Sequence, residues 1–294
     1  MSEQVAAGPL AWAGLLAFLV VMIAVDLMVG SGRRDMTMRT AAVWSAIWVA
    51  LALVFGAGLW ALEGAEPGEA YFAGYAMEKA LSLDNVFVFT LIFATLGVPR
   101  TEQPRILLWG ILIALFLRGL FIFAGAEALE TYSWVAWPFA ALLVWTGWRI
   151  LRSGEAHDEG AKIVERVQAR FPALKPAATA LAAVALADVI FAVDSVPAIL
   201  AITTDTFIVF SANAFALLGL RALFFLVAGA IARFAYLQLG LGLLLIAIGG
   251  KLAYGELTGD KVPTALTLGV IVAVISVTVG ASLLRERRTT PTAH

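Results

Sequence analysis

Two apolar stretches of the chain each carry acidic residues at the same spacing. The first reads Glu78-Lys-Ala-Leu-Ser-Leu-Asp84-Asn85, and the second reads Asp188-Val-Ile-Phe-Ala-Val-Asp194-Ser195. In each stretch, an acid is followed six residues later by an aspartate and then by a small polar side chain. Carboxylate, amide and hydroxyl oxygens are the ligands that hard divalent cations prefer. The pattern indicates a metal-ion site built from Glu78, Asp84, Asn85, Asp188, Asp194 and Ser195.

Other ligand types are nearly absent from the sequence. The chain has no cysteine and only two histidines, His157 and His294, and both histidines lie in polar segments. A metal bound within the apolar part would therefore be held by oxygen atoms alone, which favours Mn²⁺, Mg²⁺ or Ca²⁺ over zinc or copper. We expect no permanently bound cofactor, since the ion would be the cargo.

The elements that must position these acids are membrane spans. Of the 294 residues, 62% are hydrophobic and only 14% are charged, which is far from the composition of a soluble domain. About 20 apolar residues are needed to cross the hydrocarbon layer as a helix. We predict an all-α, polytopic membrane protein that forms one domain over 1–294, with nine spans near 9–29, 40–62, 71–97, 106–127, 133–151, 178–202, 207–231, 236–254 and 264–284.

The cations between the spans predict the orientation. With the amino terminus outside, fifteen lysines and arginines lie on the inner side and Lys261 alone lies outside. Cytoplasmic connections carry such an excess, so we expect an inner-membrane protein whose carboxyl terminus is cytoplasmic. The connection 152–177 is a cytoplasmic loop in which Ile163, Val167 and Phe171 recur at helical spacing, which predicts an amphipathic helix on the inner surface. The inner cations are Arg33, Arg34, Arg39, Arg100, Arg105, Arg149, Arg152, Lys162, Arg166, Arg170, Lys175, Arg233, Arg285, Arg287 and Arg288.

Nine ionisable residues remain at membrane depth. Each such charge costs about 2.5–3.5 kcal/mol on insertion scales, so we expect them to face one another inside the bundle. Lys79, Arg118, Arg221 and Lys251 would compensate the charges of the four site acids and Asp26. Asp26 stands apart from the two motifs, near the inner end of the first span, where it either joins the site or caps the span.

The motifs belong to a longer internal repeat. Glu78 matches Asp188 at an offset of 110, Arg118-Gly-Leu-Phe matches Arg221-Ala-Leu-Phe at 103, and Gly-Trp-Arg149 matches Gly-Gly-Lys251 at 102. The third span runs inward and the sixth runs outward, so the two halves form an inverted three-plus-three repeat over about 71–151 and 178–254. Secondary transporters of this architecture bind their substrates near the midplane, between the repeats.

Helix geometry separates the acids within each motif. At about 100° per residue, Glu78 shares a face with Asn85, and Asp188 shares one with Ser195, whereas Asp84 and Asp194 point roughly 120° away from the upstream acids. Pro197 removes a backbone donor, so we expect a break or kink after Asp194-Ser195 that turns Asp194 toward the site. We also expect Arg118 and Arg221 to pair with site carboxylates when no ion is bound.

These motifs closely resemble the two signature helices of the TerC family, as do Leu218-Gly-Leu-Arg221-Ala-Leu-Phe-Phe and Ala24-Val-Asp26-Leu. The similarity spans roughly residues 10–285. It implies a membrane protein of the wider lysine-exporter-like transporter group, associated with Mn²⁺ efflux and historically with tellurium resistance. The choice of manganese over Ca²⁺ or Mg²⁺ comes from this resemblance alone.

The sequence thus favours a secondary exporter of a divalent cation, most simply Mn²⁺, rather than an enzyme. Its partners would be the ion and the lipid bilayer, without nucleic acid, and homo-oligomerisation stays open. Three alternatives differ in kind: a non-transporting component of a tellurite or metal stress-resistance complex, an oxyanion or amino-acid exporter anchored by Arg118 and Arg221, and an intramembrane aspartyl protease. The protease lacks the Gly-x-Gly-Asp element expected of that class.

Overall fold

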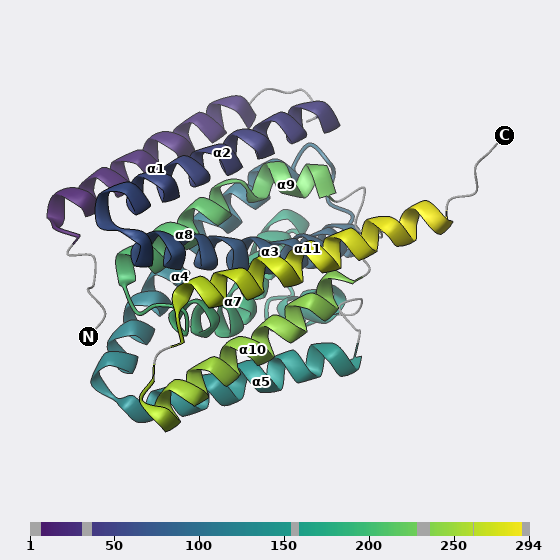
Figure 1. The fold of residues 1–294 in the computed structure, drawn as a ribbon. Helices are drawn as coiled ribbons and strands as arrows, with labels where there is room; N and C mark the ends of the chain where they lie inside the picture. The colour runs from purple at the N-terminus through teal and green to yellow at the C-terminus, as the bar shows by residue number, and fades with distance from the viewer. Residues whose placement is uncertain (1–6, 31–36, 154–158, 228–235, 261, 290–294) are drawn as a thin grey trace.

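The computed structural model of the chain describes residues 7–30, 37–153, 159–227, 236–260 and 262–289. In these ranges the chain forms eleven α-helices and one short 3₁₀ helix, and no strand (Figure 1). The predicted all-α architecture is therefore confirmed for the described residues. The elements are α1 (Pro9–Gly30), α2 (Met38–Glu63), α3 (Ala65–Thr95), α4 (Gln103–Thr131), η1 (Ser133–Val135), α5 (Ala136–Ser153), α6 (Glu159–Arg170), α7 (Pro176–Leu200), α8 (Thr206–Leu218), α9 (Leu220–Val227), α10 (Leu237–Thr258) and α11 (Thr264–Thr289).

Seven of these helices are long and apolar enough to cross a membrane, namely α1, α2, α4, α5, α7, α10 and α11. An eighth span arises if α8 and α9 are counted together, because they meet at Gly219 with a bend of 44°. The predicted span 207–231 is thus a broken one, and its last residues, from 228 on, lie outside the described part. The remaining predicted span corresponds to α3, which begins at Ala65 and carries several charges along its 31 residues. The count of nine spans stays a prediction.

The outer faces of the bundle expose large apolar side chains. Leu10 on α1, Phe116 on α4 and Val277 on α11 are 89%, 74% and 68% exposed. A soluble protein rarely leaves so many large apolar residues uncovered. A lipid environment accounts for this surface.

Glycines bring helices α5 and α10 together over most of their length. A Cβ atom built on Gly147 of α5 would lie 2.5 Å from the carbonyl oxygen of Gly242, and one on Gly249 of α10 would lie 2.9 Å from the carbonyl oxygen of Ala140. The two helices are therefore antiparallel and their backbones touch. Small residues at a crossing allow this close approach in membrane proteins.

Gly147→Ala is expected to destabilise the protein by about 1–3 kcal/mol, because the added methyl group overfills the crossing. The matched control is Gly250→Ala on α10, where a Cβ atom meets nothing within 4 Å. Thermal unfolding of both purified variants in detergent measures the difference. Equal melting temperatures for the two variants would contradict the packing described for α5 and α10.

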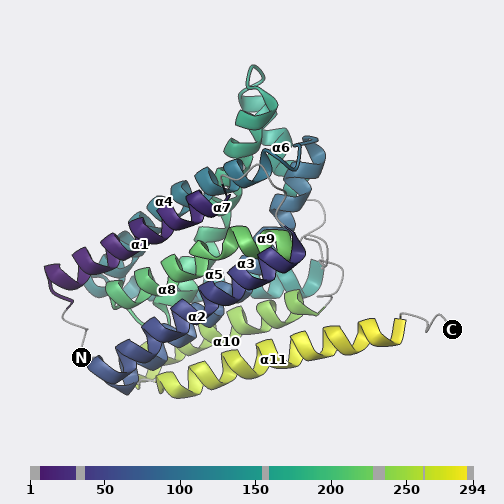
Figure 2. The same ribbon diagram turned by 90° about the horizontal axis from the view of Figure 1, so that it is seen from above.

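The connection 152–177 contains the predicted amphipathic helix, now seen as α6, but the apolar face of this helix contacts the protein and not the membrane surface as predicted. Ile163, Val164 and Val167 are buried in a cluster with residues of α3 and α7, instead of lying on the membrane surface. Gly160 allows the contact, since a Cβ atom there would lie 2.6 Å from Leu91 Cβ. Figure 2 shows α6 and the start of α7 projecting at one edge of the bundle. The apolar stripe of α6 therefore serves packing within the protein.

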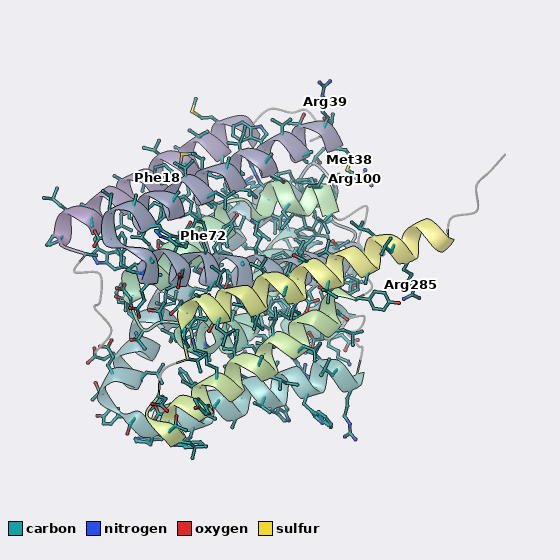
Figure 3. The ribbon with its side chains drawn as sticks, viewed as in Figure 1. Phe18, Met38, Arg39, Phe72, Arg100 and Arg285 are labelled. Carbon is teal, nitrogen blue, oxygen red and sulfur yellow. The ribbon has the colours of Figure 1, made fainter. Side chains whose placement is uncertain are left out.

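Arginines gather at the end of the bundle where α2 begins and α11 ends. Arg39, Arg100 and Arg285 all lie at this end, while Phe18 and Phe72 lie toward the other (Figure 3). These three residues come from three separate connections or helix ends, so their common side agrees with the charge bias read from the sequence. The predicted topological cations Arg33, Arg34, Arg233 and Lys261 and the two histidines, His157 and His294, lie outside the described residues.

Candidate functional site

Arg118 joins the two upstream acids of the repeated motif. Its Nη1 atom forms an ion pair with Oε1 of Glu78 on α3, and its Nε and Nη2 atoms donate to the two carboxylate oxygens of Asp188 on α7 at 3.2 and 3.1 Å. Arg118 and Glu78 are 0% exposed and Asp188 is 2% exposed. Two carboxylates thus share one guanidinium, which leaves the group with a formal charge of −1. A buried group of charges is stable only when it is closely paired, so this surplus is costly.

The two downstream aspartates lie apart from this group and have neutral partners. Gln238 Nε2 of α10 donates to Asp84 at 3.1 Å, and Thr146 Oγ1 of α5 donates to Asp194 at 2.9 Å. Both aspartates are half-buried. Glu159, at the start of α6, acts electrostatically on both of them, and Arg149 of α5 acts on Asp194 with the opposite sign. Each aspartate is therefore held by the third helix of the other predicted repeat.

Helix α7 runs without interruption through Pro197 to Leu200, so the expected break after Ser195 is wrong. Pro197 lies in the last turn of the helix and is followed there by only three more helical residues. With the helix intact, the ideal angle of about 120° between Asp188 and Asp194 is kept. This geometry explains why Asp188 binds Arg118 while Asp194 turns to Thr146.

The register of α3 and α7 places the four acids in two layers. A Cβ atom on Gly74 would contact Ile199 Cγ2 at 3.4 Å, so these residues lie at one level. The two helices are antiparallel. Counted from that contact toward the end of α3, Glu78 is four residues from Gly74, and Asp194 is five residues from Ile199. Asp84 is ten residues from Gly74 and Asp188 is eleven from Ile199, so at 1.5 Å per residue the two layers are about 9 Å apart. The first layer holds Glu78 and Asp194, and the second holds Asp84 and Asp188.

The neutral candidates on these helices are buried. Asn85 and Ser195 are each 1% exposed, and the Asn85 Nδ2 and Ser195 Oγ atoms have no hydrogen-bond partner in the described part of the protein. The same holds for Ser82 Oγ, half-way between Glu78 and Asn85. A buried polar group without a partner costs about 1–3 kcal/mol, so such groups call for an explanation.

Three of the other charges predicted at membrane depth have partners outside the group of Glu78, Arg118 and Asp188. Asp26 on α1 pairs with Arg221 on α9 at 2.9 Å, and Arg221 also donates to the backbone oxygen of Asp26. Lys79 donates to the carbonyl oxygen of Ala216 on α8 at 3.1 Å. Asp26 and Arg221 thus form a pair of their own between α1 and the broken span, away from the acids of the motif.

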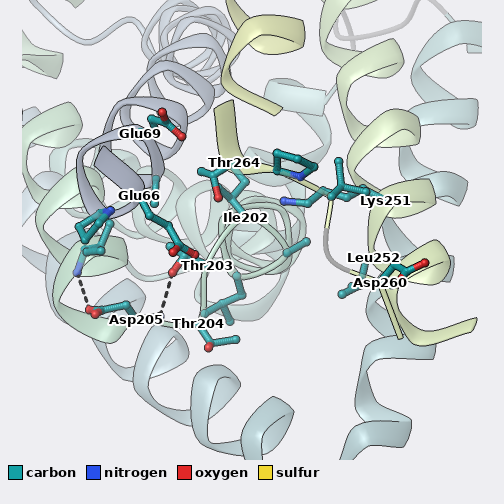
Figure 4. Close-up of a pocket in the computed structure, with 18 of the residues that line it drawn as sticks. Glu66, Glu69, Ile202, Thr203, Thr204, Asp205, Lys251, Leu252, Asp260 and Thr264 are labelled. Carbon is teal, nitrogen blue, oxygen red and sulfur yellow. Dashed lines mark hydrogen bonds between the residues drawn. The ribbon is translucent and has the colours of Figure 1, made fainter. Parts of the chain in front are cut away.

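Lys251 lines a cavity of about 630 Å³ at the end of the bundle opposite the arginines. Figure 4 shows Glu66, Glu69 and Asp205 on one side of this space and Lys251 and Asp260 on the other. Glu256 completes a lining with five acids. The cavity therefore has a negative lining that attracts cations. Its acids were not singled out in the sequence, because they lie at span ends, where charged residues are ordinary.

No three Asp, Glu or His side chains of the described residues come close enough together to hold a metal ion in this conformation. The expected set of four acids is divided instead: Glu78 and Asp188 meet through Arg118, and Asp84 and Asp194 bind separate neutral donors. Sequence reasoning missed those donors, Gln238 and Thr146. It also missed Asn213 on α8, which is 1% exposed and has no hydrogen-bond partner among the described residues. Their one sequence signal is a polar side chain within an apolar helix.

Taken together, these features define a polytopic helical membrane protein whose core contains a paired but unbalanced group of charges. Sequence comparison then assigns it: residues 63–290 match the family described as "Integral membrane protein TerC family", and the chain belongs to that family. The resemblance read from the two motifs is thereby confirmed.

Similar proteins cover nearly the whole chain. "Uncharacterized membrane protein STKORF319" of Myxococcus xanthus is 40% identical over 297 residues, covering 94% of this chain and 92% of that protein. "Putative membrane-bound redox modulator Alx" of Escherichia coli (strain K12) is 37% identical over 304 residues, covering 92% and 93%. No solved structure matches the chain.

Proposed function

We propose that the protein is a secondary exporter of a divalent metal cation, Mn²⁺ in the first instance, with nine spans and two inverted repeats. The observation that carries this proposal is the group of Glu78, Arg118 and Asp188. Two fully buried carboxylates on repeat-related helices share a single cation and keep a surplus negative charge. Ionisable residues in membrane helices typically mark the path of an ion.

The packing of the helices supports the inverted repeat. Two of the three pairs of matching helices run antiparallel. In α3 and α7, Met77 shares a cluster with Ala198 and Ile92 shares one with Val184. In α5 and α10, Gly147 approaches Gly242 and Ala140 approaches Gly249. The contacts across the halves also correspond, because α4 packs on α7 as α8 packs on α3. Asp84 in the first half is bound by α10 of the second half, and Asp194 in the second half is bound by α5 of the first, so these contacts correspond as well.

Exchange of one cation for another is the proposed mechanism. In this conformation the Arg118 guanidinium occupies the place between Glu78 and Asp188 that a metal ion would take. When the ion enters, Arg118 moves away, and the carboxylates bind the ion together with the neutral oxygens of Asn85 and Ser195. Asp84 and Asp194, one in each layer, bring the ion to and from this place. The oxygen ligands suit Mn²⁺, Mg²⁺ or Ca²⁺, and the choice of Mn²⁺ rests on the family resemblance.

The alternatives are less well supported. An oxyanion or amino-acid exporter would need a guanidinium available to its substrate, whereas Arg118 binds two acids and Arg221 binds Asp26. An aspartyl protease would need two adjoining aspartates, whereas Asp84 and Asp194 have separate partners. The name of the Escherichia coli relative refers to redox modulation. This chain has no cysteine, so a redox role would come through the ions that it moves.

We propose that the protein lies in the inner membrane, with its amino terminus outside and its carboxyl terminus in the cytoplasm. An alkaline phosphatase reporter, which is active only outside the cytoplasm, is expected to be inactive after the last residue and active in the connection between α2 and α3. The charge bias is the reason. Activity at the carboxyl terminus would contradict the orientation and place the acidic cavity on the inner side.

Purified protein in liposomes provides the test of transport. Vesicles that contain a Mn²⁺-sensitive dye are expected to take up Mn²⁺ only when the protein is present, and Mg²⁺ and Ca²⁺ in excess measure selectivity. Empty liposomes are the control. Uptake equal to that of empty liposomes would favour the non-transporting component of a stress-resistance complex.

A further inference from the structure

Asn213 on α8 has a buried side-chain amide whose role the packing of the helices does not explain. Its side chain is 1% exposed, and neither Nδ2 nor Oδ1 has a hydrogen-bond partner in the described part of the chain. Neighbouring Ser211 is equally buried, but its hydroxyl donates to the carbonyl oxygen of Ile208 at 3.0 Å. Buried amides are almost always paired on both sides, so Asn213 is the exception on this helix.

The clusters and contacts of its neighbours place Asn213 near Arg118 and Glu78. One apolar cluster contains Ile122, Ala192 and Val209, and another contains Ala114, Val184 and Leu217. Each member lies one helical turn from a polar residue on its own helix, and residues four apart lie on one face. Three parallel stripes result: Ala114, Arg118 and Ile122 on α4; Val184, Asp188 and Ala192 on α7; Val209, Asn213 and Leu217 on α8.

Each stripe has its polar residue in the middle and an apolar residue on either side. The flanking residues of all three helices belong to the same two clusters, so the middle residues lie along the shared interior of α4, α7 and α8. A Cβ atom on Gly119, next to Arg118, would lie 3.2 Å from Phe210, three residues before Asn213, so Asn213 lies on the side of α8 that faces α4, within about one turn of the level of Arg118. A Cβ atom on Gly74, one turn before Glu78, would lie 3.3 Å from Ala212, so Asn213 lies within about one turn of the level of Glu78. Asp188 lies farther along α7 and is reached by the Arg118 side chain.

Charge and hydrogen bonding give Asn213 a role there. Arg118 donates to Asp188 and forms an ion pair with Glu78, and among the described residues no acid accepts a hydrogen bond from the amide of Asn213. The side-chain oxygen of asparagine is a neutral ligand of the kind that Mn²⁺, Mg²⁺ and Ca²⁺ accept. A third carboxylate at this place would add to a group that already carries surplus negative charge, whereas an amide supplies oxygen without charge.

From this geometry we infer that Asn213 is a ligand of the transported cation. Its Oδ1 atom binds the divalent ion between Glu78 and Asp188 after the Arg118 guanidinium has left, so that α8 joins α3 and α7 around the ion. The inference rests on the proposed export function and adds to it a ligand from the broken span. The Asn213 amide has no hydrogen-bond partner while Arg118 pairs with the acids, and the bound ion would become its partner in the loaded state.

The experiment compares three variants in liposomes with Mn²⁺ as the probe. Asn213→Leu keeps the approximate volume and removes the oxygen, and it is expected to raise the KM for Mn²⁺ by about tenfold or more, as the loss of groups that support a metal ion does elsewhere. Its melting temperature without metal is expected to equal or exceed that of the wild type, since an unpaired amide is removed. Asn213→Asp restores an oxygen ligand and is expected to bring the KM back to the wild-type value or below, with slower release. Ser211→Ala, on the same helix, is expected to behave as the wild type.

The outcomes separate the inference from the function on which it rests. A wild-type KM in Asn213→Leu would overturn the role of Asn213 and leave export intact. A loss of transport in both Asn213 variants together with a lower melting temperature would also overturn it, in favour of a purely structural amide. If neither the wild type nor Ser211→Ala moves Mn²⁺, the proposed function fails, and the inference fails with it.

Discussion

Asp84→Asn and Asp194→Asn are each expected to lower Mn²⁺ export by about 100-fold or more, the upper range for loss of a residue that supports a metal site. Asparagine keeps an oxygen that can accept the hydrogen bond from Gln238 or Thr146, so the contacts of α3 with α10 and of α7 with α5 persist. The substitutions therefore remove charge and leave the packing in place. Initial rates of Mn²⁺ uptake into liposomes measure the effect.

Two controls make this prediction specific. Glu165→Gln on α6 removes one negative charge from an exposed position and is expected to leave the rate unchanged. Gln238→Met removes the donor to Asp84 while keeping the carboxylate, and it is expected to retain most of the transport. Wild-type rates in both aspartate variants would show that the half-buried aspartates lie off the path of the ion, and the site would then be reduced to the central group.

The fold was predictable from composition because lipid imposes one rule on every span. Each predicted span coincides with a helix or with the pair α8 and α9, since backbone groups in the hydrocarbon layer must be paired within the segment. The predictions were wrong where contacts between helices determine where a helix begins or bends. Helix α3 continues outward past the predicted start because its first turns pack on α2, where Gly68 meets Trp60. The bend at Gly219 was missed, and the break expected at Pro197 is absent, because α7 continues to Leu200.

The directions of the motif acids were predictable from the sequence, but their partners were not. Spacing along one helix showed that Glu78 and Asp84 face different ways, and the structure keeps that division. The sequence could not show which helix lies opposite each acid. Asp84 meets Gln238 and Asp194 meets Thr146 only because α5 and α10 cross at Gly147 and Gly242. Asn213 was overlooked because one amide in an apolar helix resembles an ordinary core residue.

Arg118→Gln is expected to have the largest effect on stability. It would leave Glu78 and Asp188 buried without their shared cation, and loss of one partner from a buried pair costs about 3–5 kcal/mol. Arg221→Gln is expected to cost less, because its partner Asp26 is 8% exposed and lies between α1 and α9. Thermal unfolding in detergent without metal compares the two variants. Equal losses would contradict the central place given to Arg118.

A neutral variant separates stability from function at the same position. Glu78→Gln, Arg118→Gln and Asp188→Asn together remove all three charges; the two acid substitutions keep the side-chain volume, and the arginine substitution shortens the side chain. Replacement of a buried charge group by uncharged residues is often neutral for stability, so the melting temperature is expected to return close to that of the wild type. Mn²⁺ uptake is expected to stay at the level of empty liposomes, because no carboxylate is left to receive the ion. If the neutral variant instead transports Mn²⁺, the central charges serve folding alone, and the path of the ion lies elsewhere in the bundle.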